Sequence, residues 1–265
     1  MAPGSWTRRR ALATVGSLSL GGLLAACGDG SDSGSGGPSG ATAQRTVTTE
    51  EGGEATVEPR STPSRATNER FDDAGGGCRL STELTGGPYY FDVDAIRRDI
   101  TEDRDGMPLR VGVRVREAGS CEPLENAVVD VWHCDAVGTY SGFEAASRGV
   151  PGSGPTDDET YLRGAQVTDA DGIVEFKTIY PGFYPGRTVH IHAKVHLDRS
   201  TLLTTQFFFD DRVSDRVFSA APYAAADQRR IRNDGDGIYD RSLELTLSDE
   251  GDGMLGLITL DVQRT

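Results

Sequence analysis

The chain has 265 residues, a length that allows one good-sized domain with appended segments. It carries 41 acidic against 27 basic side chains, which gives a formal net charge of −14 at pH 7. A surface this acidic repels a phosphate backbone, so the composition argues against nucleic acid as a partner. Strong acidity favours instead a protein that stays soluble outside the cell.

The first 26 residues have the pattern of an export signal. Three arginines, Arg8 to Arg10, precede an apolar, Gly-rich run that ends in Leu24-Ala-Ala-Cys27. The arginines fit a twin-arginine signal, and the second pattern fits a bacterial lipobox whose cysteine is acylated. We therefore expect a signal peptide at 1–26 and a lipid-anchored Cys27 that holds the protein at the outer face of the cytoplasmic membrane. An uncleaved anchor or plain secretion is the alternative.

Residues 27–75 are rich in Gly, Ser, Thr, Glu and Pro and contain almost no aromatic residues. Such a segment buries too little apolar surface to offset the entropy lost on ordering. We expect it to be a disordered tether. The folded domain is then expected at 76–265.

Three further cysteines, Cys78, Cys121 and Cys134, lie in this domain. In an oxidising compartment two of them are expected to pair. An expected strand at 127–133 separates Cys121 from Cys134 by roughly 20 Å, which is too far for a disulfide. Cys78 is thus the expected common partner, and the sequence leaves open which of the other two it takes.

From Leu109 onward the hydrophobic pattern has a period of two. Val111, Val113 and Val115 alternate with glycine and arginine, which is typical of a half-buried strand. Further strands are expected at residues 127–133, 173–178, 188–197, 202–209, 243–247 and 257–262. Short strands separated by Gly and Asp turns indicate an all-β fold, a β-sandwich with short helices.

One helix is expected at residues 223–232. It is followed by Asn233-Asp-Gly-Asp-Gly237, a run that looks like a calcium-binding loop. The downstream spacing of such a loop is missing, so we predict a turn there.

The residues that suggest chemistry are two histidines and two tyrosines. His190 and His192 are two apart on an expected strand, so their imidazoles point to the same face and can share a metal ion. Tyr140 and Tyr184 would complete a set of two phenols and two imidazoles. Because a free tyrosine has a pKa of about 10, only a strong Lewis acid holds its phenolate near neutral pH. Ferric iron fits this set better than zinc.

Several motifs together make the chain resemble a known family. They are Gly87-Pro-Tyr-Tyr90, Arg98-Asp-Ile100, Pro123 to Ala127, Val131-Trp-His-Cys-Asp135, Gly138-Thr-Tyr-Ser141 and the run from Tyr180 to His192. Over about residues 78–265 the chain resembles the intradiol ring-cleavage dioxygenases, which include catechol and protocatechuate dioxygenases. The resemblance implies a non-haem Fe(III) enzyme that uses O2 to open a catechol ring between its hydroxylated carbons, giving a muconate-type dicarboxylic acid.

The same resemblance assigns roles to individual residues. It places Tyr140, Tyr184, His190 and His192 as iron ligands. Tyr184 would also leave the metal and take up a substrate proton. Arg187 would stabilise the anionic substrate, and Gln206 would contact the reacting ring.

Each of these residue types also has an ordinary use, as packed tyrosine, salt-bridging arginine or strand glutamine. Four other tyrosines compete for the ligand roles: Tyr89, Tyr90, Tyr161 and Tyr180. Only two residues separate Tyr184 from Arg187, fewer than in the best-studied members of the family, which leaves the substrate open. His133 is predicted to be a satisfied core histidine and His196 a surface one. The loop at 141–161 is expected to form part of the substrate pocket.

Two other classes of protein remain as alternatives. One is a non-catalytic β-sandwich at the cell surface with a vestigial metal pocket, which would lack a ligand. The other is a zinc hydrolase that uses His190 and His192 with a nearby Asp or Glu. The sequence does not identify which catechol is bound. The family includes dimers and larger assemblies, so a homo-oligomer is possible.

Overall fold

The computed structural model describes residues 45–48, 54–57, 70–71, 78–92, 95–147, 158–198, 200–225 and 229–264. All of them belong to the second of two compact units, Ala41–Thr265. The first unit, Met1–Gly40, contains the predicted signal peptide and Cys27 and lies outside the described residues. Within the described ranges, no helix is long and apolar enough to cross a membrane.

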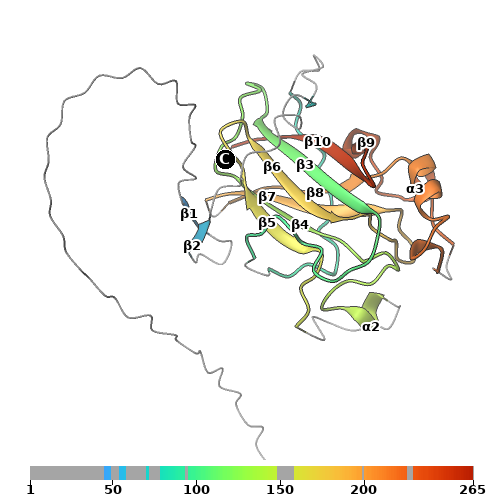
Figure 1. Ribbon diagram of the computed structural model, residues 1–265. Coiled ribbons are helices and arrows are strands. Elements are labelled where there is room, and N and C mark those ends of the chain that lie inside the picture. The colour runs from blue at the N-terminus through green and yellow to red at the C-terminus, as the bar shows by residue number, and fades with distance from the viewer. Residues whose placement is uncertain are drawn as a thin grey trace, which may run out of the picture. The chain divides into compact units, whose positions relative to one another are not determined.

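Two four-stranded sheets form a β-sandwich, as expected (Figure 1). The first, here called the site sheet, is antiparallel and has the order β5-β4-β7-β8. Its strands are β4 (Val128–Trp132), β5 (Arg163–Val167), β7 (His190–Leu197) and β8 (Ser200–Phe208). The second, the back sheet, has the order β6-β3-β10-β9. Its strands are β3 (Pro108–Glu117), β6 (Ile173–Ile179), β9 (Thr246–Glu250) and β10 (Gly253–Val262).

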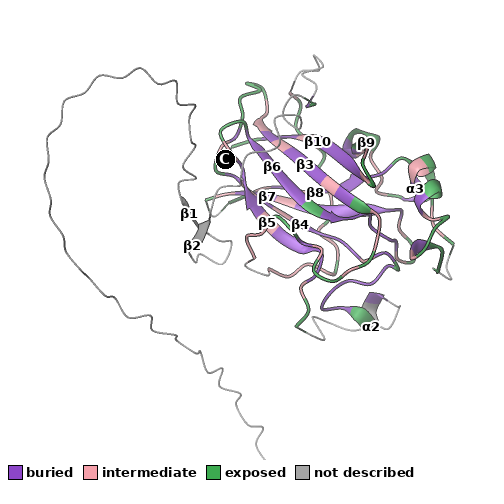
Figure 2. Cartoon of the chain, viewed as in Figure 1, coloured by how far each residue is buried: buried purple, intermediate pink, exposed green. Residues whose placement is uncertain are grey.

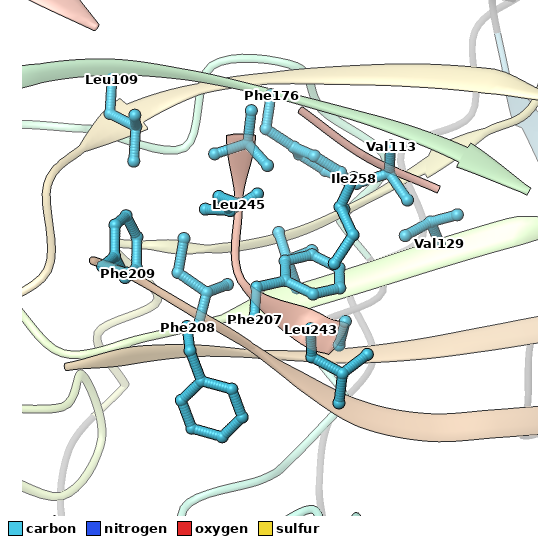
Figure 3. Packing of buried hydrophobic residues seen from close by; sticks show 14 of the residues in the cluster. Leu109, Val113, Val129, Phe176, Phe207, Phe208, Phe209, Leu243, Leu245 and Ile258 are labelled. Carbon is cyan, nitrogen blue, oxygen red and sulfur yellow. The ribbon is translucent and has the colours of Figure 1, made fainter. Parts of the chain in front are cut away.

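The core lies between the two sheets and is formed by the apolar side chains that alternate along each strand with more exposed ones. In β3 the valines predicted to face inward are buried, whereas the arginines between them are partly exposed. Figure 3 shows Leu109, Val113, Phe176 and Ile258 of the back sheet packed toward Val129 and Phe207 of the site sheet. Burying each such side chain contributes about 1.5–3 kcal/mol. Most of the strand surface is accordingly buried (Figure 2).

The strand predictions are mostly confirmed, with two differences. β5 was not predicted, because Arg163-Gly-Ala-Gln-Val has no clear alternation of apolar and polar residues. The strand expected at 243–247 is wrong in position. There the chain forms the 3-10 turn η3 (Arg241–Leu243), capped by the Asp240 side chain, and the strand β9 begins at Thr246.

The helices are short. They are α2 (Glu144–Ser147), α3 (Asp211–Val217) and the 3-10 turns η1 (Tyr223–Ala225) and η2 (Asn233–Gly235). The helix expected at 223–232 is wrong in its described part, where only η1 is helical. The Tyr223 hydroxyl bonds to the backbone of Met107 and Tyr180, and Arg230 pairs with Asp211. These tertiary contacts outweigh the helix propensity of the alanines.

Within the segment predicted to be a disordered tether, 27–75, the structure describes two short strands and residues 70–71. β1 (Arg45–Thr48) and β2 (Glu54–Val57) pair as antiparallel strands. Phe71 is only 6% exposed and packs on the outer face of the back sheet, against Ile173, Leu255 and Leu257.

Cys78 and Cys121 form a disulfide, with Cα atoms 5.4 Å apart. This resolves the alternative that the sequence left open. Cys134 is a buried thiol, and burial raises its pKa. From Cys78 the chain crosses to the outer face of the site sheet. Residues 78–92, here called the covering segment, bond to the back sheet at Ser81 and to β8 at Leu84.

Candidate metal and substrate site

The two histidines lie on the outer face of the site sheet. Because their neighbour Ile191 points into the core, His190 and His192 face the opposite way. Strand register places Trp132 of β4 and Gln206 of β8 on either side of His192. The Trp132 ring stacks on the His192 ring, with centroids 5.0 Å apart and planes 5° apart. The sheet thus fixes the orientation of both imidazoles.

Two loops bring the tyrosines to this face. Tyr140 lies in the loop after β4, and Tyr184 lies in the loop before β7. The loops touch at Gly138, which has a φ of +91°, and a Cβ atom there would lie 2.1 Å from the Phe183 carbonyl oxygen. Only glycine allows this approach. It brings Tyr140 and Tyr184 together, with ring centroids 5.6 Å apart.

The four side chains form one cluster of rings. Ring centroids are 5.4 Å apart for Tyr184 and His190, 4.7 Å for His190 and His192, and 6.2 Å for Tyr140 and His192. The two Nε2 atoms lie 3.1 Å apart. His190 Nδ1 donates to the Thr188 carbonyl, which leaves the Nε2 lone pair of His190 facing the centre of the cluster.

This cluster fits a metal ion. The Tyr140 hydroxyl is fully buried and has no hydrogen-bond partner within the described part of the chain, a state that buried polar groups rarely show. Burial raises the pKa of Tyr140 well above its ordinary value and raises that of Tyr184 to about 12. Burial also lowers the pKa of His190 to about 3 and that of His192 well below its usual range. Neutral imidazoles are the form that binds metals.

The donor set is not of the usual zinc type. Within the described ranges, no group of three or more His, Cys, Asp or Glu side chains is placed to hold a metal ion. No described carboxylate therefore joins His190 and His192 as a third ligand for a zinc hydrolase. Two phenols complete the set instead. Phenolates are hard anionic donors, which suit a strong Lewis acid such as ferric iron.

Arg187 lies at the edge of the cluster, where it contacts Tyr184 of the cluster and two further side chains, Gln206 and Asp236. Its Nη1 lies 3.4 Å from the Tyr184 hydroxyl, its Nη2 donates to Gln206 Oε1 at 2.6 Å, and its Nε donates to Asp236 at 2.8 Å. Gln206 in turn donates to the Thr85 carbonyl at 2.8 Å. Tyr184 and Arg187 are half-buried, so the cluster opens toward solvent on this side.

The covering segment also contributes to the site, which sequence reasoning missed. Tyr89 stacks on Tyr140 at 4.6 Å and meets the Tyr184 ring edge-on at 5.4 Å. Gly87 has a φ of +70°, and a Cβ there would lie 3.0 Å from His192 Cε1. The Gly-Pro-Tyr-Tyr motif at residues 87–90 was the sequence signal for this contribution. Its contact with the cluster could not be predicted, because it arises only when the covering segment folds over the site sheet.

The other competing tyrosines lie outside the cluster. Tyr180 bonds to Ser214 at 2.8 Å, Tyr161 stacks on the Arg104 guanidinium, and Tyr90 packs on the far side of Trp132. Tyr140 and Tyr184 have ring contacts with His192 and His190, respectively.

Two predictions on the remaining histidines have opposite outcomes. His133 is a satisfied core histidine, as predicted, with contacts of 2.8 Å to the Cys134 carbonyl and 2.7 Å to the Thr178 hydroxyl. His196 was predicted to lie at the surface, but it is only 7% exposed. A register shift between Val195 and His196 sets it against Thr201, which contacts its ring at 3.1 Å.

Part of the loop expected to form the pocket wall is described, at 141–147 and 158–161. Arg163 of β5 holds this loop in place through Ser141. Its guanidinium is buried, bonds to Ser141 at 2.8 and 2.9 Å, and lies 4.3 Å from the Phe91 ring centroid. Ser141 follows Tyr140 directly, so this contact fixes the backbone that carries the phenol.

The β-sandwich thus gathers two phenols and two imidazoles on one face of the site sheet. The chain belongs to the intradiol ring-cleavage dioxygenases: the family model described as Dioxygenase matches residues 85–246. An intradiol ring-cleavage dioxygenase from Tetranychus urticae is 35% identical, with a TM-score of 0.67, over 70% of this chain and 95% of that one. The dioxygenase domain of a carbohydrate-binding fusion protein from Streptomyces sp. SirexAA-E is 29% identical, with a TM-score of 0.53, over 71% of this chain and 100% of that one.

Curated relatives agree with this family. A chlorocatechol 1,2-dioxygenase from Pseudomonas putida is 30% identical over 50% of this chain and 55% of its own length. The protocatechuate 3,4-dioxygenase beta chain from Burkholderia cepacia is 32% identical over 52% of this chain and 63% of its own length. The chain spans about half the length of the curated relatives it matches.

Proposed function

We propose that this protein is a non-haem Fe(III) dioxygenase that cleaves a catechol-type ring with O2 between the two hydroxylated carbons, to a muconate-type dicarboxylic acid. The observation that carries the proposal is the convergence of Tyr140, Tyr184, His190 and His192 around a buried phenol hydroxyl without a partner. These four residues would hold the iron. Bound there, ferric iron would withdraw electron density from a catecholate and make a ring carbon reactive toward O2.

The residues around the cluster have roles that follow from their contacts. The Tyr184 oxygen lies at the open side, where, held as a phenolate by the metal, it could accept a proton from a catechol hydroxyl. Arg187 keeps a permanent positive charge beside it, 3.4 Å from that oxygen, which stabilises an anionic substrate. Gln206 holds the guanidinium from the other side. Tyr89 packs over Tyr140 and helps to exclude water from the cluster.

We also propose that Cys27 is lipidated and that the domain works at the outer face of the cytoplasmic membrane. The Arg8-Arg9 and Leu24-to-Cys27 patterns support this, as does the disulfide between Cys78 and Cys121, since disulfides persist mainly in oxidising compartments. The choice among catechol, protocatechuate and larger catechols depends on the residues of the pocket wall.

A visible absorption spectrum of the purified full chain, reconstituted with Fe(III), tests the enzyme directly. Tyrosinate bound to Fe(III) is expected to give a broad visible band and a red-brown colour. Anaerobic catechol should shift that band to longer wavelength, and O2 should then yield a ring-opened product. A chain that stays colourless with Fe(III) would refute the proposal and leave the non-catalytic binding protein as the better interpretation.

A further inference from the structure

The turn at residues 233–237, which includes η2, bonds to the residues that precede His190. Residues 233–237, singled out above for their resemblance to a calcium loop, pack against the segment that leads into His190. Thr188 donates its hydroxyl to Asn233 Oδ1 at 2.7 Å and its backbone N–H to Asp236 Oδ2 at 2.9 Å. Asn233 is held in turn by the Phe209 carbonyl, at 2.9 Å. The turn is therefore connected to the cluster of four rings through Thr188, whose carbonyl accepts the His190 Nδ1–H.

Asp236 makes the contact that matters most for chemistry. Its carboxylate is buried, 2% exposed as a side chain, and accepts the Arg187 Nε–H at 2.8 Å. Its other oxygen accepts the Ile238 N–H at 3.0 Å. Burial by itself would raise the pKa of Asp236, but these N–H donors and the Arg187 charge hold it below the ordinary value. The carboxylate thus stays ionised beside Arg187.

This contact fixes the direction of the guanidinium fork. A guanidinium is planar, so an acceptor placed at Nε sets the plane in which the two Nη atoms lie. In this chain Nη1 then faces the Tyr184 hydroxyl and Nη2 faces Gln206. Only the exposed Pro185 and Gly186 separate Tyr184 from Arg187, and Gly186 has a φ of +88°.

We propose that Asp236 is a positioning residue, which orients Arg187 toward the substrate oxygen at Tyr184 and acts through Arg187 alone. The proposal rests on the dioxygenase function proposed above. It assigns a role to a turn that sequence patterns leave without one.

The test is a double-mutant cycle in the iron-loaded full chain. Asp236→Asn should lower kcat about 10- to 100-fold, because a misplaced charge loses stabilisation of the anionic substrate. In an Arg187→Ala background, Asp236→Asn should cause no further loss of kcat. Asp234→Asn is the matched control, since it removes the same charge from an exposed side chain of the same turn, and it should leave kcat unchanged. Equal losses in both backgrounds would overturn the proposal.

A second variant covers the case in which Asp236→Asn does not fold. Arg187→Lys keeps the charge but lacks the fork that Asp236 orients. It should lower kcat in the same range. A kcat equal to that of the unmodified chain would show that orientation of the fork is not needed, and would overturn the proposal.

A measurement without iron separates this proposal from the enzymatic one. In ¹⁵N spectra of the metal-free full chain, the Arg187 Nε–H should give a signal protected from solvent exchange. Asp236→Asn should remove that protection, and Asp234→Asn should keep it. If the chain has no dioxygenase activity but shows this pattern, the proposed function fails while the Asp236–Arg187 pairing stands. If protection persists in Asp236→Asn, the positioning proposal fails by itself.

Discussion

Tyr140 is the residue whose surroundings most clearly require a further partner. Its ring is enclosed by Tyr89, Tyr184 and His192, and its hydroxyl has no hydrogen bond among the described residues. A buried hydroxyl in that state costs about 1–3 kcal/mol. Replacing it by phenylalanine removes the unpaired group, so the metal-free protein should gain stability even as it loses a proposed ligand.

We therefore predict opposite effects of Tyr140→Phe on iron binding and on stability. The visible band of the Fe(III)-loaded protein should weaken strongly, whereas the metal-free protein should unfold at an equal or higher temperature. Tyr180→Phe is the control, because that buried hydroxyl bonds to Ser214 and lies outside the cluster. It should keep the band and lose stability. An unchanged band in Tyr140→Phe would remove Tyr140 from the ligand set.

His133 predicts how stability depends on pH. Burial lowers its pKa to about 4, against an ordinary value near 6.5. Below pH 6.5 the unfolded chain therefore takes up a proton that the folded chain does not. The contribution of neutral His133 to the free energy of unfolding is therefore fully present above pH 6.5. It is lost as the pH falls toward 4, and the loss amounts to about 2 kcal/mol at pH 5.

Urea unfolding of the metal-free full chain at pH 7 and pH 5 measures this effect. The other histidines and the carboxylates are common to the unmodified chain and to His133→Gln, so their contributions cancel in the comparison. The unmodified chain should lose about 2 kcal/mol more than the variant between the two pH values. Equal losses would mean that His133 is protonated in the folded protein too.

At this scale, sequence patterns identified the four residues of the ring cluster but not the residues that support them. Tyr140, Tyr184 and His190 stand in dense motifs whose spacing suggests chemistry. Asp236 and Tyr89 come from segments far away in the chain, and only the folded path brings them to the cluster. Their roles could not be read from local spacing.

Among the elements, strands with clear alternation were predictable and packed turns were not. β3 follows its valine pattern, whereas β5 is a strand because both of its neighbours, β4 and the Ile96 bridge, pair with it. α3 was missed, although Asp210 caps it by accepting the Arg212 N–H. Its sequence has no wide apolar stripe, and only Ser214 and Val217 are buried.

The disulfide at the start of the covering segment should make the stability of the protein depend on redox conditions. The disulfide from Cys78 to Cys121 closes a loop of 43 residues, worth about 4 kcal/mol in the chain-entropy account. Reductant should therefore lower the Tm of the full chain. The double variant Cys78→Ser, Cys121→Ser should have the lower Tm from the start and should not respond to reductant. A response in that variant would point to another cause.

At the scale of the whole molecule, we expect loss of the proposed lipid anchor to change the location of the protein without changing the stability of the sandwich. Cys27 precedes the domain by a long segment, and the described sandwich is complete without it. Cys27→Ala should move the protein from the membrane fraction to the soluble fraction of the cell envelope, with an unchanged Tm. Mass spectrometry of the unmodified chain should show acylation at Cys27. A variant that stays with the membrane would contradict the lipid anchor.

The parallel pairing of β3 with β10 also bears on how the protein is made. β10 follows every other strand of the two sheets in chain order, yet it lies between β3 and β9, with nine residues in register with β3. A ribosome has thus produced all four proposed ligands before it produces the strand that closes the back sheet. Domains fold as units during synthesis, and distant pairings form slowly. A chain that ends before β10 therefore has every proposed iron ligand but lacks the strand that joins β3 to β9.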